Sequence, residues 1–162
     1  EYNIKDEKKF YRDIMILVDK IYSEELTTVK GAYEFITKSD KNLFIGSNSM
    51  KKRILSGLKK VELNKYFYEE NIVSFDMVER PKPYPDIYLE VVERNNLLKE
   101  ETIIIEDSSV GTQAGFASGI RVIGLTAGGH WYEGRSNKEL IKSGATKIIN
   151  DYKNLNETIA NL

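Results

Sequence analysis

Three polar segments of this sequence follow short apolar stretches, two of them directly, and each carries residues that could act on a phosphorylated substrate. The first segment is Ser47-Asn48-Ser49, which comes after the run 43–46. A hydroxyl group and backbone N–H groups at a strand-to-helix junction form a cradle for an anion. The alternative is that Asn48 or Ser49 is simply the N-cap of the following helix.

The second segment contains Lys82, which lies between Pro81 and Pro83. Because prolines restrict the backbone around them, the long lysine side chain projects from a stiff base. A lysine held in this way suits the neutralisation of a phosphate or a carboxylate. Two alternatives stay open, namely that Arg80 is the functional cation, or that both are ordinary surface charges.

The third segment is the carboxylate pair Glu106 and Asp107, which follows the apolar run 103–105. Two adjacent carboxylates at the end of a buried strand are costly unless they are solvated, paired or bound to a cation. Mg²⁺ takes carboxylate oxygens and keeps water and substrate ligands. The alternative is that Asp107 caps the next helix. Together, the three segments predict Mg²⁺-assisted chemistry on a phosphorylated substrate.

The hydrophobic pattern predicts the elements that position these segments. Apolar spacings of three and four predict a long amphipathic helix over 5–26, and Thr27 or Thr28 offers an N-cap for a helix over 29–38. Strands are predicted at 43–46, 72–75, 102–105, 121–125 and 147–149, and further helices at 50–61, from 86, and at 111–118, 140–143 and 155–162. Unbroken apolar strands alternating with helices favour an α/β fold with a parallel sheet. In such sheets the site lies at the carboxyl ends of the strands.

Composition excludes several classes of function. The 162 residues suit one domain, and 24 basic against 25 acidic residues argue against a nucleic-acid binder. The absence of Cys excludes disulfides and thiolate catalysis, and it fits the reducing cytoplasm. No apolar run approaches the roughly 20 residues of a membrane helix, so we expect no membrane partner. The single histidine, His130, adjoins Trp131 in a glycine-rich loop, which we interpret as a packed or surface feature.

The motifs resemble those of the haloacid dehalogenase superfamily, in the branch that includes β-phosphoglucomutase and phosphoglycolate phosphatase. The family's second motif is an apolar strand ending in Ser or Thr, as in 43–49. Its third is a lysine in a Lys-Pro-x-Pro-Asp-x-Tyr setting, as in 82–88. Its fourth is Glu-Asp-Ser-x-x-Gly after a strand, as in 106–111. The resemblance runs from about Thr28 to the C-terminus.

This resemblance implies a role for each candidate residue. Ser47 would hydrogen-bond the transferring phosphoryl group, Lys82 would neutralise it and hold the nucleophile, and Asp107 would bind Mg²⁺ with Glu106 beside it. The resemblance also implies a Rossmann-like core over 28–162, with 1–27 as the remnant of a helical cap. The implied activity is that of a phosphatase or phosphomutase acting on a small phosphorylated metabolite.

The family's first motif, Asp-x-Asp-Gly-x-x-x-Asp, has no match in this sequence. Its first Asp attacks phosphorus, and its strand lies at the centre of the sheet. We therefore expect the first central strand to be absent from this chain, leaving two unpaired inner edges. The N-terminal segment that carries it is expected from the parent chain or from a second chain. Two alternatives are a non-catalytic phosphate- or metal-binding remnant and a flavodoxin-like or receiver-like binding domain.

Overall fold

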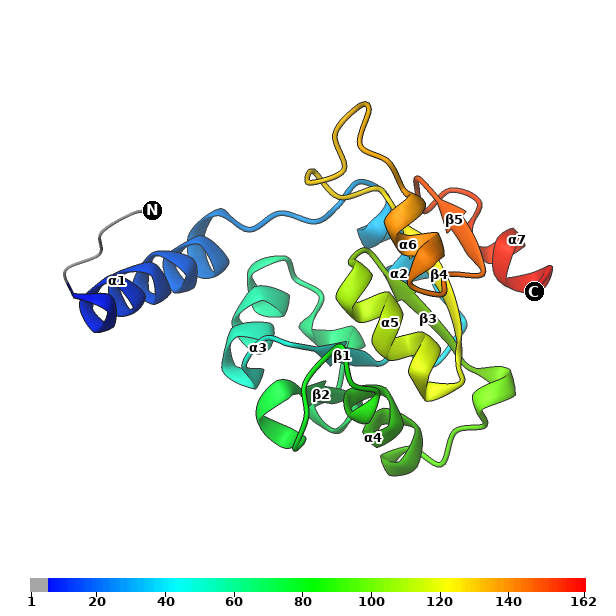
Figure 1. Cartoon of the computed structure of the whole chain (residues 1–162), viewed down its shortest axis with the longest axis horizontal. Helices are drawn as coiled ribbons and strands as arrows, with labels where there is room; N and C mark the ends of the chain where they lie inside the picture. Colours follow the sequence, from blue (N-terminus) through cyan, green and yellow to red (C-terminus); the bar gives the residue numbers. More distant parts are fainter. Residues whose placement is uncertain (1–5) are drawn as a thin grey trace.

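Helices alternate with short strands in the computed structural model, which describes residues 6–162 (Figure 1). The strands are β1 (Ile45–Ser47), β2 (Ile72–Ser74), β3 (Ile103–Glu106), β4 (Arg121–Leu125) and β5 (Lys147–Ile149). The α-helices are α1 (Glu7–Lys20), α2 (Ala32–Lys38), α3 (Lys51–Lys60), α4 (Asp86–Arg94), α5 (Ser109–Ser118), α6 (Lys138–Lys142) and α7 (Leu155–Ala160). The predicted α/β class is therefore confirmed. No helix of the described part is both long enough and apolar enough to cross a membrane.

The strands form two separate parallel sheets. β1 pairs with β2, with Ser47 opposite Ser74, while β4 lies between β3 and β5, with Glu106 opposite Gly124. Within residues 6–162, no ladder joins β1 to β3, so each of these strands has one edge without a strand partner, and residues of both strands line one cavity. This arrangement matches the two unpaired inner edges expected from the sequence.

The strands are apolar because helices cover them. The side chains of Ile72, Val73 and Ile123 are fully buried. Helix α4 packs against β1, β2 and α5, while α5 covers β3 and β4. A cluster of buried residues joins the two helices to the second sheet: Tyr88, Ile104, Ala114, Ile120 and Val122. The small residues of α5 allow this close approach, since a Cβ at Gly115 would collide with Val122.

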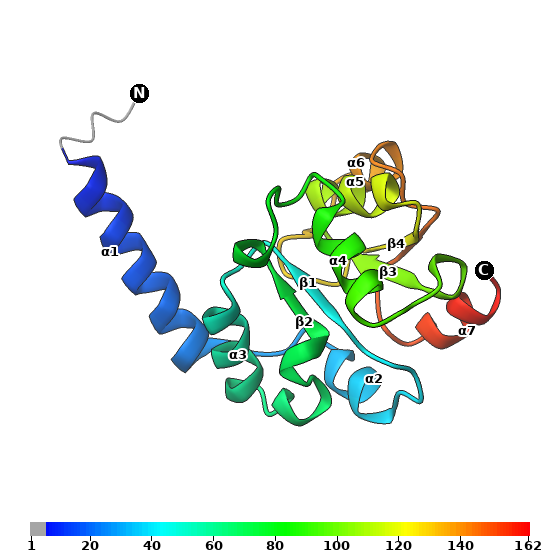
Figure 2. The same ribbon diagram turned by 90° about the horizontal axis from the view of Figure 1, so that it is seen from below.

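Helix α1 projects away from the two sheets (Figure 2). It begins after Asp6, whose carboxylate accepts a hydrogen bond from the Lys9 N–H, and none of its residues is buried. It ends at Lys20 and continues as a π-helix over Ile21–Glu25, whereas the sequence predicted one uninterrupted helix over 5–26. Residue 5 lies outside the described part. The proposed boundary between cap and core near residue 27 stays a prediction.

The predicted start of the second helix is wrong. α2 begins at Ala32, after Gly31, and neither Thr27 nor Thr28 caps it. Gly31 has a φ of 83°, a left-handed conformation that glycine adopts readily and threonine rarely does. The backbone therefore turns at Gly31 and the helix follows this turn.

Candidate active site

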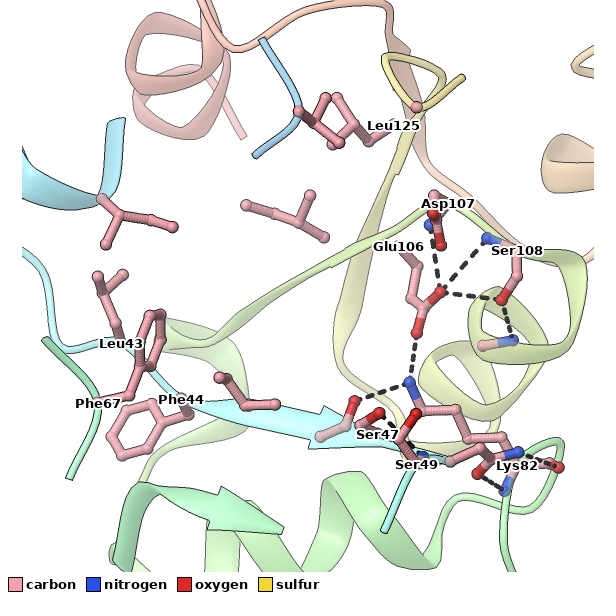
Figure 3. A pocket seen from close by; sticks show the side chains of 18 of the residues that line it. Leu43, Phe44, Ser47, Ser49, Phe67, Lys82, Glu106, Asp107, Ser108 and Leu125 are labelled. Atoms are coloured by element: carbon pink, nitrogen blue, oxygen red, sulfur yellow. Dashed lines mark hydrogen bonds and ion pairs between the residues drawn. The ribbon is translucent and has the colours of Figure 1, made fainter. Parts of the chain in front are cut away.

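One cavity of about 640 Å³ gathers the residues predicted to do chemistry (Figure 3). It lies at the carboxyl ends of β1 and β3, as expected for a parallel sheet. Its lining includes every candidate residue: Ser47, Asn48, Ser49, Lys82, Glu106 and Asp107. The roles of these residues in binding or catalysis stay predictions.

The loop after β1 is organised around Ser47 and Asn48. The Ser47 Oγ accepts a hydrogen bond from the Ser49 N–H, at 3.1 Å. Asn48 bridges to the backbone of Lys82, accepting from its N–H at 2.9 Å and donating to its carbonyl at 3.1 Å. The capping alternative for Asn48 and Ser49 is wrong, because Met50 occupies the N-cap position of α3 and no side chain caps it. Asn48 instead fixes the loop that carries the lysine.

Lys82 and Glu106 form a buried ion pair between the two sheets. Their side chains are 8% and 9% exposed. The Lys82 ammonium also donates to the Gly46 carbonyl at 2.9 Å and to the Tyr88 hydroxyl oxygen at 2.8 Å, so one cation contacts both inner strands. Arg80, the alternative cation, pairs instead with Asp86, at 2.8 and 3.0 Å. The cation that lines the cavity is therefore Lys82.

Glu106 keeps its negative charge in spite of its burial. Burial alone raises the pKa of the Glu106 carboxyl, but the charge of Lys82 and hydrogen bonds from Lys82, Tyr88 and Ser108 outweigh it and hold that pKa below its usual range. Burial, together with the adjacent charge of Glu106, raises the pKa of Tyr88. Tyr88 is therefore a neutral phenol that donates a hydrogen bond to the Glu106 carboxylate.

We expect the Glu106 carboxylate to make stability depend on pH. Because its pKa is lower in the folded than in the unfolded chain, its contribution is fully present above the ordinary glutamate value of about 4.3. That contribution is lost as the pH falls through the lower, folded pKa. Urea unfolding between about pH 6 and pH 3 should show a shallower decline for Glu106→Gln than for the unmodified chain. Equal slopes would contradict this assignment. Glu70→Gln serves as the control, because Glu70 is exposed and forms no ion pair within the described residues.

The Asp107 carboxylate faces the cavity and is only loosely engaged. Its side chain is 54% exposed, and the His130 ring lies beside it, with Nε2 at 3.6 Å from Oδ2. The capping alternative for Asp107 is wrong, since the Ser108 hydroxyl oxygen caps α5 by accepting from the Gly111 N–H at 3.1 Å. The Asp107 oxygens are therefore available to a ligand.

A hard cation fits this carboxylate as one of several ligands. Mg²⁺ is usually held by one or two carboxylates together with water and phosphate oxygens. No group of three His, Asp or Glu side chains converges anywhere in residues 6–162. Glu106 already bonds Lys82 and Tyr88 through one oxygen and Ser108 through the other. Its predicted role as a second metal ligand stays a prediction.

Two residues at the site were not predicted from the sequence. Tyr88 completes the buried ion pair, and its place in the Lys-Pro-x-Pro-Asp-x-Tyr setting was the signal for it. Trp131 donates its indole N–H to the Asp107 carbonyl at 3.1 Å. No spacing signalled this contact, because the two residues are far apart in the sequence.

An apolar slot continues from the cavity along the facing edges of β1 and β3. A second cavity, of about 730 Å³, extends it toward the amino ends of both strands. Its walls include the following apolar residues from the two strands and their approaches: Leu43, Phe44, Ile45, Ile103, Ile104 and Ile105. Asn42 and Thr102 line the second cavity, and Ser47 and Asp107 line the first, so β1 and β3 run in the same direction.

Comparison with known proteins places these features in a context. The sequence model of one protein family, described as haloacid dehalogenase-like hydrolase, matches residues 1–125 of this chain. The chain is 30% identical over 141 residues to a phosphorylated carbohydrates phosphatase from Thermotoga maritima, covering 85% of this chain and 62% of that protein. The chain thus spans less than two thirds of that relative's length.

Solved structures show the same fold. A haloacid dehalogenase-like protein of unknown function from Agrobacterium tumefaciens superposes with a TM-score of 0.87 at 28% identity, over 98% of this chain and 71% of that one. A protein assigned as a β-phosphoglucomutase from Thermotoga maritima superposes with a TM-score of 0.76 at 28% identity, over 99% and 73%.

Proposed function

Since this chain belongs to the haloacid dehalogenase-like hydrolases, we propose that it is the core of a Mg²⁺-dependent phosphatase or phosphomutase of small phosphorylated metabolites. The observation that carries the proposal is the meeting of Ser47, Lys82 and Asp107 at one cavity. Hydroxyl, ammonium and carboxylate are the groups that bind a phosphoryl dianion and its divalent counter-ion. The activity named for the Thermotoga relative supports the same class of substrate.

Each side chain has a definite task in this proposal. The Ser47 oxygen accepts from the Ser49 N–H, which leaves its own hydrogen free to donate to a phosphoryl oxygen. Lys82 supplies positive charge close to the phosphoryl group, and Glu106 and Tyr88 fix its position. Asp107 binds Mg²⁺ through its exposed oxygens. When bound, Mg²⁺ neutralises the charge that develops on the phosphoryl oxygens.

We further propose that the attacking carboxylate arrives on a strand that enters the slot between β1 and β3. Each of the two strands has an edge without a strand partner, both strands run in one direction, and the walls are largely apolar. An extended apolar segment parallel to both would satisfy these groups. Its carboxyl end would meet Ser47, Lys82 and Asp107. This segment belongs to the parent chain or to a second chain, and the reaction takes place in the cytoplasm.

The activity is tested by complementing the chain with such a strand. The peptide carries about five apolar residues, a usual strand length, followed by Asp-x-Asp-Gly. The assay mixes the 162-residue chain with the peptide, MgCl₂ and a sugar phosphate such as glucose 6-phosphate. The released inorganic phosphate is then measured. We expect phosphate release only from the complete mixture. The first Asp of the peptide attacks phosphorus as the bond to the sugar oxygen breaks, and the second Asp gives its proton to that oxygen, so the sugar leaves as an alcohol. Water, deprotonated by the second Asp, then hydrolyses the acyl phosphate, which releases inorganic phosphate and restores both carboxyl groups.

Matched controls separate the parts of this proposal. A peptide with Asn in place of the first Asp should bind without turnover, and Asp107→Asn or removal of Mg²⁺ by a chelator should abolish release. Peptide binding without release from any sugar phosphate would contradict the catalytic proposal and favour a non-catalytic remnant. Failure of the peptide to bind would contradict the strand proposal.

A further inference from the structure

The loop that connects β4 to α6 folds over the end of β3 at Asp107. Its central residues are 128–135, and we call them the clip. The Trp131 indole N–H donates to the Asp107 carbonyl at 3.1 Å. The His130 ring lies beside the same residue, with Nε2 at 3.4 Å from the carbonyl oxygen and 3.6 Å from Oδ2. The clip therefore contacts both the backbone and the carboxylate of the proposed metal ligand.

Arg135 holds the clip in this shape. Its guanidinium lies 4.1 Å from the centre of the Trp131 ring, which is close enough for a cation–π interaction. It also donates to the His130 carbonyl at 2.7 Å and to one Glu139 oxygen at 2.8 and 3.1 Å. Arg135 thus ties the indole to the first residues of α6, which gives the loop a fixed support.

The backbone of the clip is turned tightly against Asp107. The Trp131 N–H donates to the Gly128 carbonyl at 2.9 Å, which closes a turn. A Cβ at Gly128 would lie within 2.9 Å of the His130 ring and 4.0 Å of an Asp107 oxygen. Gly128 also lines the cavity at the carboxyl ends of β1 and β3. A side chain at this position would push the ring away from Asp107, so the close approach depends on glycine.

We propose that Trp131 and Arg135 are positioning residues for Asp107. This inference rests on the proposed function, in which Asp107 binds Mg²⁺. The carboxylate itself is exposed and accepts no hydrogen bond from other described residues, so its orientation depends on the backbone that carries it. The indole fixes that backbone through its hydrogen bond to the Asp107 carbonyl. Groups that orient a metal ligand typically change metal affinity by about 10- to 100-fold when removed.

The experiment exploits the fact that Trp131 is the only tryptophan in the sequence. In a ¹⁵N-labelled sample its indole N–H gives one cross-peak, and the Asp107 amide gives a second probe. MgCl₂ is titrated into the chain, and both signals are followed. We expect them to shift along the same binding curve.

Arg135→Lys keeps the charge but loses the planar stacking and the fork of donors, and should weaken Mg²⁺ binding about 10-fold. Trp131→Phe keeps an aromatic ring but has no N–H to donate. It should weaken Mg²⁺ binding similarly, as followed by the Asp107 amide signal.

The control is Arg94→Lys, because Arg94 also pairs with a glutamate four residues away, Glu90, but away from the cavity. It should leave Mg²⁺ affinity unchanged. If Arg135→Lys and Trp131→Phe lower thermal stability while Mg²⁺ affinity stays the same, the clip is merely structural and the inference is overturned. If Mg²⁺ does not shift the Asp107 amide signal of the unmodified chain, the proposed role of Asp107 as a metal ligand is wrong. The inference about the clip is then wrong as well.

Discussion

Lys82→Met should lower the free energy of unfolding by about 3–5 kcal/mol, because it removes one partner of a buried ion pair. The remaining Glu106 carboxylate is 9% exposed and would have no counter-charge. Methionine fills much of the same volume, so the loss reports charge rather than a cavity. Urea unfolding at neutral pH measures it. The loss should shrink in mild acid, where protonation makes the stranded carboxyl neutral.

A double-mutant cycle makes this expectation specific. Lys82→Met combined with Glu106→Gln removes both charges, and should recover a large part of the stability that Lys82→Met loses. Arg80→Met serves as the matched control, because Arg80 also pairs with a carboxylate but is 54% exposed. Its effect should be clearly smaller, as for other surface pairs. An equal loss in Lys82→Met and Arg80→Met would refute the buried-pair account.

Gly111→Ala should destabilise the chain, although glycine-to-alanine changes inside helices usually stabilise them. A Cβ at Gly111 would lie far closer than 3.0 Å to the carboxylate atoms of Glu106. Glu106 would have to move, and its bonds to Lys82 and Tyr88 would break. Overpacking alone costs about 1–3 kcal/mol, and the disrupted ion pair adds to it. Chemical unfolding gives the size of the change.

The control for this substitution is Gly129→Ala, where a Cβ would meet nothing within 4 Å. It should change the free energy of unfolding little. A structure or amide spectrum of Gly111→Ala should also show displacement around Glu106 and Tyr88. If Gly111→Ala is as stable as the unmodified chain, α5 does not pack as closely against the Lys82–Glu106 pair as in this structure.

The sequence predicted the elements well wherever local pattern determines them. The apolar runs before Ser47 and Asp107 became strands, because a parallel sheet buried on both faces requires unbroken apolar segments. The start of α2 was wrong because periodicity does not reveal that Gly31 turns the chain with a positive φ. The change from α-helix to π-helix at Ile21 had no signal in the apolar spacing either.

The site was predictable as a set of residues and much less as a network. Strand order brings Ser47, Lys82 and Asp107 to one edge, so their meeting follows from topology. The partners of each group depend on contacts between distant segments. Asn48 bonds the backbone of Lys82, and Trp131 bonds the Asp107 carbonyl. Such contacts leave no periodic pattern in one sequence, so only the three-dimensional structure reveals them.

The two facing open edges also bear on how the molecule behaves in concentrated solution. An unpaired strand edge is a template for foreign polypeptide, and natural proteins usually shield such edges with charge, proline or a covering element. Here residues of both strands line a cavity of about 730 Å³ with largely apolar walls, which suits an extended apolar tail. Short disordered extensions, such as expression tags rich in apolar residues, are therefore the additions most prone to cause self-association, and polar tags are the safer choice.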